Sequence, residues 1–426
     1  MRDEQDLLRT LHSAADQARS VPGGLTEAVA ARRRRRRARH RAQVTLAAAA
    51  VVLVAGGTAF ALSRGGGQPA DPATQAIATA TAIPSSDDPA PTSAPPEHIT
   101  NLNPKAVTKI PIKAVNGGKY RVAAALSPTE ILLTAEKSFE KAGQVLIYDT
   151  PAKSARLLGD VPSPREGYFA QDFVADDRSV AWWGETPNND DVWADLWVIP
   201  RTGGEARQLK ELTGDAAEIE NLNVTADHVV WSVRKGGVYR IPLAGGEPEK
   251  IQNSDDLHLD RWPWAYALGP GKMSERSHSR LVNLETGQTI DVKVSEGDRG
   301  VYCTSELCIG SNGGTSFTQR PDGSGRRKLP AEVSMAGPEE RLEGDLLPAV
   351  GTHETAPLVY DLKRDRVFMF GKSGVGFGRL PGVLWWDDDA RMVETCDDVC
   401  TAAEKGGGKE YTVVNLLALR DSYPSE

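Results

Sequence analysis

The stretch Leu196-Trp-Val-Ile-Pro-Arg-Thr-Gly-Gly-Glu-Ala-Arg-Gln-Leu209 recurs later in the chain as Val238-Tyr-Arg-Ile-Pro-Leu-Ala-Gly-Gly-Glu-Pro-Glu-Lys-Ile251. The two copies align without gaps and share five identical positions. In each copy an apolar run precedes a turn that holds two glycines, which predicts two strands joined by that turn. Looser copies lie at 145–158, 280–292, 317–329 and 357–370. Self-similarity of this kind predicts a repeat architecture.

A second element, a turn that leads into an apolar run, precedes the clearer copies and lies at 126–133, 174–182 and 224–231. We expect these turns to lead into the inner strands of the repeats, at a mean spacing of about 42 residues. The expected starting points are Glu130, Ser179, His228, Ala265, Val301, Leu347 and Val383. This spacing predicts an all-β fold, a β-propeller of seven four-stranded blades, with six or eight blades as the alternatives. Residues 107–112 are expected to supply the strand that closes the ring.

These turns resemble the repeats of a known family. The Ser-Pro-Thr-Glu stretch at 127–130 and the Ile-Pro-x-x-Gly-Gly stretches at 199–204 and 241–246 are similar to those of TolB-like β-propellers. The usual Ser-Pro-Asp-Gly turn of that family is degenerate here. The whole layout looks like that of membrane-anchored extracytoplasmic propeller proteins of high-GC bacteria, and the resemblance implies a protein-binding platform.

Residues 44–62 carry no charge and are rich in Ala, Val and Leu. As a helix these 19 residues would span roughly 28 Å, close to the thickness of a bilayer's hydrocarbon core. Eight arginines lie at 32–41 just before the segment, whereas only Arg64 follows it closely, so the positive-inside rule places the N-terminus in the cytoplasm. These features predict a transmembrane signal-anchor helix. A signal peptide cleaved after Ala61 is the alternative, because Ala59-Phe60-Ala61 fits a signal peptidase.

The chain therefore divides into four predicted parts. An Arg-rich cytoplasmic tail occupies 1–43, the transmembrane helix 44–62, a disordered linker rich in Pro, Ala and Thr 63–104, and the propeller 105–420. The tail has a net charge of +6, so the rest of the chain carries −14 of the total of −8. An acidic propeller disfavours binding to nucleic acid.

The four cysteines form two close pairs, Cys303 with Cys308 and Cys396 with Cys400. A two-residue turn at 305–306 would place Cys303 directly across from Cys308 in a hairpin. Neither pair has the Cys-x-x-Cys spacing of a zinc site, and no His lies within a few residues of either. We therefore predict two disulfides, which indicate an oxidising compartment.

No sequence motif typical of catalysis occurs. The chain has no Gly-x-Ser-x-Gly elbow, and its histidines lack metal-binding spacing. We predict no catalytic, metal-binding or cofactor-binding residues. Acidic runs at 176–177, 190–191 and 387–389 are interpreted as turns on a solvated rim, with acid-base work or calcium binding as the alternative.

All nine tryptophans lie in the propeller region. Three of them fall at repeat-equivalent strand positions and are interpreted as packing between blades. These are Trp182, Trp197 and Trp231. Three others lie near acidic or proline-containing loops and are predicted to form an exposed recognition surface. These are Trp193, Trp262 and Trp264.

Together these features predict a single-pass cell-membrane protein with an extracytoplasmic binding or sensing module. The propeller is expected to recognise a protein, a peptide or a cell-envelope glycan, and the tail at 1–43 to contact a cytoplasmic regulatory protein. An arginine-rich stretch before the anchor resembles the layout of membrane proteins associated with extracytoplasmic-function sigma factors. The alternatives are a cell-envelope hydrolase with its active site in the propeller channel and a structural spacer without a specific ligand.

Overall fold

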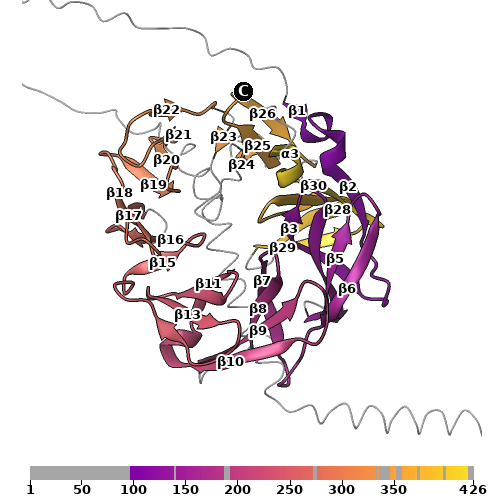
Figure 1. Ribbon diagram of the computed structural model, residues 1–426. Helices are drawn as coiled ribbons and strands as arrows, with labels where there is room; N and C mark the ends of the chain where they lie inside the picture. The colour runs from indigo at the N-terminus through magenta and orange to yellow at the C-terminus, as the bar shows by residue number, and fades with distance from the viewer. Residues whose placement is uncertain are drawn as a thin grey trace, which may run out of the picture.

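The computed structural model describes residues 96–420 apart from 139–140, 187–191, 272–275, 332, 335–345, 352–356, 372–374 and 397–399. The described residues form seven sheets arranged around a ring (Figure 1). Each sheet has a core of four hydrogen-bonded strands. The predicted seven-bladed, all-β propeller is confirmed.

The first four blades follow one another along the chain. Blade 1 contains β3 (Lys119–Ser127), β4 (Glu130–Ser138), β5 (Lys141–Asp149) and β6 (Ser154–Asp160). Blade 2 contains β7 (Phe169–Ala175), β8 (Ser179–Glu185), β9 (Trp193–Pro200) and β10 (Arg207–Thr213). Blade 3 contains β11 (Ile219–Val224), β12 (His228–Val233), β13 (Val238–Pro242) and β14 (Glu249–Lys250). Blade 4 contains β15 (Leu257–Leu259), β16 (Trp264–Leu268), β17 (His278–Asn283) and β18 (Thr289–Asp291).

Blade 5 again uses consecutive strands, whereas blades 6 and 7 each include a strand from the N-terminal end of the domain. Blade 5 contains β19 (Asp298–Cys303), β20 (Cys308–Asn312), β21 (Thr315–Gln319) and β22 (Arg327–Lys328). Blade 6 contains β23 (Val333–Ser334), β24 (Leu346–Gly351), β25 (Pro357–Asp361), β26 (Arg366–Met369) and the added β1 (Glu97–His98). Blade 7 contains β27 (Val375–Leu380), β28 (Val383–Cys396), β30 (Glu410–Asn415) and β2 (Val107–Pro111), and β29 (Cys400–Gly406) pairs with β28. Short helical elements are η1 (Ile99–Asn101), η2 (Pro104–Ala106), η3 (Gly214–Ala217) and α3 (Leu416–Arg420).

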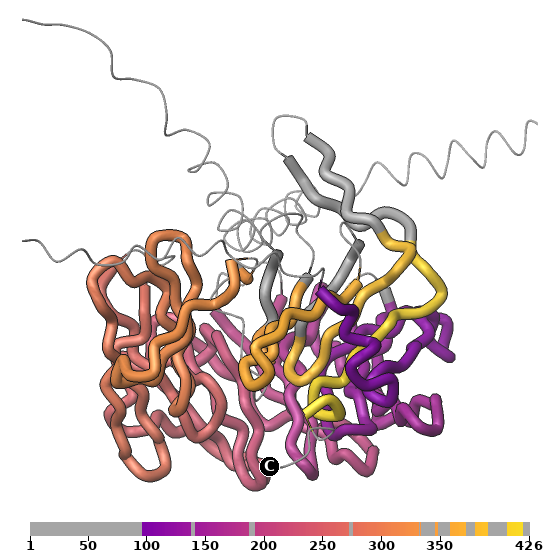
Figure 2. Tube along the Cα trace, turned by 90° about the horizontal axis from the view of Figure 1, so that it is seen from above, coloured from indigo at the N-terminus to yellow at the C-terminus, as the bar shows by residue number. Residues whose placement is uncertain are grey.

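The ring closes through the N-terminal strand, as predicted. β2 pairs antiparallel with β30, from Val107 opposite Val414 to Pro111 opposite Glu410. Figure 2 shows the first described residues, in indigo, beside the last strands, in yellow. Both ends of the domain therefore lie in one sector of the ring.

The ordered N-terminal part begins earlier than the sequence suggested. Residues 97–104 were predicted to belong to the linker, but they include β1 and η1, and β1 pairs parallel with β26 of blade 6. Ile99 is fully buried in a cluster that joins blades 6 and 7. A strand of two residues and a single buried Ile are too short to produce a hydrophobic periodicity that can be recognised in the sequence. The tail at 1–43, the segment at 44–62 and the linker up to residue 95 lie outside the described residues, and no helix of the described part is long and apolar enough to cross a membrane.

The Ile-Pro-x-x-Gly-Gly repeat forms the turn between the third and fourth strands of a blade. In blade 2 its glycines, Gly203 and Gly204, have φ of +92° and +142°, which residues with a side chain rarely adopt. The Gly204 amide donates a hydrogen bond of 2.9 Å to the carbonyl of Leu158 in β6. In blade 3 the same turn accepts at the Leu243 carbonyl from the guanidinium of Arg207 in β10. The repeated turn thus fastens each of these blades to the one before it.

The second sequence element forms the turn between the first and second strands of a blade. Asp176 shapes this turn in blade 2, where Oδ1 accepts from the backbone amides of Arg178 at 2.9 Å and Ser179 at 2.6 Å. The strands that follow these turns were expected to be the inner ones, and this was wrong. Figure 1 shows β7 nearer the centre of the ring than β9 and β10, so the first strand of the blade is the inner one. Six of the seven expected starting points lie in second strands, and Val301 alone lies in a first strand, β19.

Large aromatic side chains fill the spaces between blades, as the sequence predicted for three tryptophans. Trp182 is fully buried, stacks on Trp197 with ring centroids 6.4 Å apart, and packs in one cluster with Leu132 of blade 1. Trp231 is fully buried in the cluster that joins blades 2 and 3. Burying a side chain of this size stabilises the fold by roughly 2–3 kcal/mol.

The predicted Cys303–Cys308 disulfide is present. The two cysteines pair directly across β19 and β20, and the amide of Thr304 donates to the carbonyl of Leu307 at 2.8 Å to close the turn. For the other pair, the backbone register places Cys396 opposite Cys400 in β28 and β29. The side chains of that pair lie outside the described residues, so the second disulfide stays a prediction.

Substituting Gly159 tests the contact between blades 1 and 2. A Cβ at Gly159 would lie 2.4 Å from the carbonyl oxygen of Gly204 and 2.6 Å from Cδ1 of Ile199. We expect Gly159→Ala to lower the free energy of unfolding by about 1–3 kcal/mol, because the added methyl group pushes the two blades apart. Guanidinium unfolding of the full chain measures this. Gly269→Ala is the control, since its Cβ would make an ordinary contact, 3.4 Å from the Ser277 carbonyl. An equal loss in both variants would contradict the interpretation.

The second disulfide can be tested by alkylation. We expect Cys396 and Cys400 to react with iodoacetamide in the denatured chain only after reduction, because their backbone register allows a bridge across the hairpin. Peptide mass spectrometry reads this out, and the Cys303–Cys308 bridge serves as the internal control. Alkylation of Cys396 without reductant would show a free thiol.

Candidate functional site

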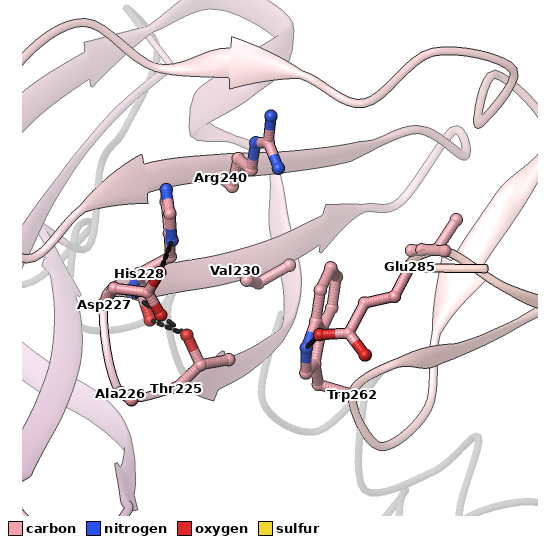
Figure 3. A pocket seen from close by; sticks show the side chains of 9 residues that line it. Thr225, Ala226, Asp227, His228, Val230, Arg240, Trp262 and Glu285 are labelled. Atoms are coloured by element: carbon pink, nitrogen blue, oxygen red, sulfur yellow. Dashed lines mark hydrogen bonds and ion pairs between the residues drawn. The ribbon is translucent and has the colours of Figure 1, made fainter.

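A cavity of about 650 Å³ lies between blades 3 and 4. Its lining comes from the turn between β11 and β12, from strands β12 and β13, and from two turns of blade 4. Figure 3 shows Val230 between His228 on one side and Trp262 on the other. Val230 is almost fully buried, so the accessible lining comes mainly from the residues on the two sides of it.

The wall on the side of blade 3 is a tight turn. The hydroxyl of Thr225 accepts from the backbone amide of His228 at 3.0 Å and donates to its carbonyl at 3.2 Å. Threonine favours such turns because its hydroxyl bonds to the nearby backbone. The Asp227 carboxylate lies 3.4 Å from Nδ1 of the half-buried His228. This wall therefore presents a carboxylate and an imidazole.

The wall on the side of blade 4 is the indole of Trp262. Its Nε1 donates to Oε1 of Glu285 at 3.0 Å, and the side chain packs against the apolar cluster between the two blades. Its backbone amide donates to Oδ1 of Asn223 at 3.3 Å, and Nδ2 of Asn223 donates to the Asp260 carbonyl at 3.3 Å. Blade 3 thus holds the Trp262 turn at two backbone positions.

Arg240 brings a cation to the cavity. Its Nε and Nη2 donate to one carboxylate oxygen of Glu249, at 3.1 and 3.0 Å. Glu249 therefore balances the charge of Arg240, while Asp227 and Glu285 add two carboxylates to the lining. The site offers hydrogen-bond donors, acceptors and an aromatic face together.

The cavity holds a carboxylate–imidazole pair, Asp227 and His228, but its hydroxyl group is not placed as a nucleophile. The Thr225 hydroxyl is bonded to the backbone of its own turn, so it is not held against a side-chain base. Across the part of the chain that the structure describes, no group of three or more His, Cys, Asp or Glu side chains could hold a metal ion.

A buried polar cluster joins blades 3 and 4 elsewhere. Oε2 of Glu220 lies 2.6 Å from Nδ1 of His258 and accepts from the Ser232 hydroxyl at 3.3 Å. In a hydrolase triad the imidazole contacts the serine, whereas here the serine and the histidine both contact the carboxylate. Ser232 is fully buried, whereas the Glu220 side chain is 31% exposed. The sequence offered no signal for this cluster, because its members come from three strands without characteristic spacing.

Stacked rings continue this cluster toward blade 5. The ring of Tyr266 lies between His258, at a centroid distance of 5.5 Å, and His278, at 4.0 Å. Nδ1 of His278 accepts from the backbone amide of Cys303 at 3.0 Å. Burial lowers the pKa of His278 to about 3, so its ring is neutral at pH 7 and holds the disulfide hairpin in place.

The three tryptophans predicted to form a recognition surface occupy different surroundings. Trp262 lines the cavity. Trp264 is half-buried and packs against the cluster between blades 4 and 5. Trp193, in blade 2, is 5% exposed, and its ring lies 3.8 Å from the Arg165 guanidinium. Trp193 therefore offers little of its ring to a partner.

Two of the acidic runs organise backbone turns. Asp387 is 1% exposed, and its Oδ1 accepts from the amides of Asp389 at 3.0 Å and Gly408 at 2.9 Å. Asp176 does the same in the turn before β8. The third run, at 190–191, lies outside the described residues. Hydrogen bonds to backbone amides, rather than to a ligand, account for these carboxylates.

No family model matches the chain, and neither does any curated protein. Solved structures with a similar fold include an oligogalacturonate lyase in complex with manganese, with 13% identity over 75% of this chain and 93% of that one, and a TM-score of 0.42. A prolyl endopeptidase matches with 13% identity over 70% of this chain and 50% of its own, with a TM-score of 0.48. The β-propeller domain of the Trilobed protease from Pyrococcus furiosus matches with 10% identity over 66% and 97%, with a TM-score of 0.41. At these identities the comparisons assign no activity.

The pH dependence of the free energy of unfolding tests whether the buried His278 ring is neutral. The folded ring stays neutral down to a pKa of about 3, whereas the unfolded side chain takes up a proton near pH 6.5. The unfolded state therefore binds more protons between these values, and stability falls as the pH falls from 6.5 toward 3, by up to about 1.4 kcal/mol per pH unit. Urea unfolding from pH 7 to pH 4 should show a shallower slope for His278→Gln than for the wild type. Tyr266→Phe, which changes no group that titrates in this range, should keep the wild-type slope. Equal slopes in His278→Gln and the wild type would contradict the assignment.

Proposed function

We propose that this protein is a membrane-anchored, extracytoplasmic binding or sensing module of the TolB-like kind, and that its propeller captures a ligand at the cavity between blades 3 and 4. The cavity is the observation that carries this proposal. It combines the fixed indole of Trp262, the carboxylates of Asp227 and Glu285 and the guanidinium of Arg240. The Thr225 hydroxyl is hydrogen-bonded to the backbone of its own turn. A pocket with an aromatic side chain and a few polar groups around it suits the binding of a small ligand.

Two features support a location outside the cytoplasm. The charge-free segment at 44–62, with its arginines on the N-terminal side, suits a signal anchor whose N-terminus is cytoplasmic. The Cys303–Cys308 disulfide suits an oxidising compartment, since cytoplasmic thiols are kept reduced. The linker then acts as a spacer between the membrane and blades 6 and 7, where the described chain begins.

The tail supports a sensing role in addition to binding. Residues 1–43 carry eleven arginines and a net charge of +6. A basic segment on the cytoplasmic side can attract an acidic surface of a regulatory protein. Ligand capture outside and partner contact inside would then occur on one chain.

Protease treatment of intact cells tests the topology. With one tag before Arg32 and another after Tyr423, we expect protease to remove the C-terminal tag and spare the N-terminal one, because the membrane shields only the tail. Immunoblotting and the mass of the mature chain read this out, and permeabilised cells are the control, in which both tags are lost. A mature chain that begins at Leu62 would identify a secreted propeller, and protection of the C-terminal tag would place the propeller inside the cell. Either result would refute the anchored module.

A further inference from the structure

The indole of Trp262 is positioned before any ligand arrives. Glu285 holds its Nε1, Asn223 holds its backbone amide, and Leu284 packs in the same apolar cluster. Because the ring is already ordered, a ligand that stacks on it loses less entropy on binding. The indole is the aromatic side chain that lines this cavity, and an aromatic ring of this kind suits stacking against the C–H face of a sugar ring.

The polar groups around this surface are mixed in sign. Asp227 and Glu285 supply acceptors, whereas His228 and Arg240 supply donors. An anionic ligand would meet the two carboxylates, and a cationic one would meet the guanidinium of Arg240. A hydroxyl group both donates and accepts, so a neutral polyhydroxylated ligand can use all four groups.

The size and openness of the cavity agree with this chemistry. A volume of about 650 Å³ lies within the range of roughly 300–1,000 Å³ that is usual for small-ligand sites. The side chain of Asp227 is 77% exposed, and Glu285 is exposed as well, so the rim opens to solvent. A chain of sugars could therefore enter with one end and continue outward.

We infer that the cavity between blades 3 and 4 binds a neutral oligosaccharide, with one sugar ring stacked on Trp262 and its hydroxyls bonded to Asp227, Glu285 and Arg240. This inference rests on the proposed binding function and specifies the ligand class. It gives Trp262 the stacking role and the charged residues the role of orienting the sugar.

Binding by the full-length chain to an array of short neutral oligosaccharides, followed by calorimetry with the best of them, tests the inference. We expect Trp262→Leu to raise the dissociation constant about tenfold, the effect of losing roughly 1.4 kcal/mol of stacking. Trp264→Leu is the matched control, because that residue lies in the adjoining strand and packs away from the cavity. Its dissociation constant should stay within about twofold of the wild type. Added salt should change binding little, since the ligand is neutral.

Glu285→Gln provides a second test if Trp262→Leu fails to fold. Its amide oxygen can still accept from Trp262 Nε1, and the side chain can still bond to a hydroxyl, so sugar binding should weaken less than about tenfold. A basic peptide would instead lose most of its affinity in this variant and would bind more weakly at high salt.

Three results would overturn the inference. The first is the absence of binding to every neutral sugar at about 10 mM, a concentration about tenfold above a millimolar dissociation constant. The second is undiminished binding in a folded Trp262→Leu variant. The third is a preference for basic peptides. If protease treatment still places the propeller outside the cell, these results refute the ligand class and leave the anchored module standing. If the propeller lies inside, the proposed function fails whatever the sugar result.

Discussion

The pairing of β2 with β30 is the constraint on which the rest of the ring depends. Five backbone pairs join the start of the domain, at Val107–Pro111, to its last strand. A blade that lacked its outer strand would leave an unpaired edge, and the first and last blades would be free to separate. Closure fixes the position of each blade relative to its neighbours, including blades 3 and 4 across the ring. The added pairing of β1 with β26 then joins the incoming chain to blade 6 as well as to blade 7.

Contacts between neighbouring blades turn this closed ring into a rigid support. Apolar clusters fill the spaces between blades, and the Gly-Gly turns of blades 2 and 3 bond to the blade before them. The cavity lies where this packing is interrupted by turns that carry polar side chains. Because Asn223 of blade 3 bonds to the Trp262 turn of blade 4, the two walls of the cavity hold a fixed separation. The binding geometry is thus a property of the interface between blades.

Several fully or partly buried polar groups, between blades or within one, are hydrogen-bonded. Glu220 contacts His258 and Ser232, and the Asp195 carboxylate accepts from the Tyr168 hydroxyl at 2.9 Å. Burial raises the pKa of the Asp195 carboxyl, because the charged form is poorly solvated there. Burying such groups costs several kcal/mol unless they are hydrogen-bonded, so these pairs fix one arrangement of the strands. A serine, a histidine and a carboxylate in proximity are therefore insufficient to indicate catalysis in this fold.

The sequence by itself determined the features that depend on neighbouring residues. The Gly-Gly repeats predicted two strands joined by a turn, the spacing predicted seven blades, and the short loop between Cys303 and Cys308 predicted their bridge. It also drew attention to Trp262, because aromatic residues beside proline-containing turns are often exposed. Only the tertiary structure decided which strand of a blade is the inner one, that Trp193 is buried while Trp262 lines a cavity, and that Glu220 meets His258. The reason is physical: strand and turn patterns are encoded within about ten residues, whereas these contacts arise between blades whose relative positions are set by closure of the whole ring.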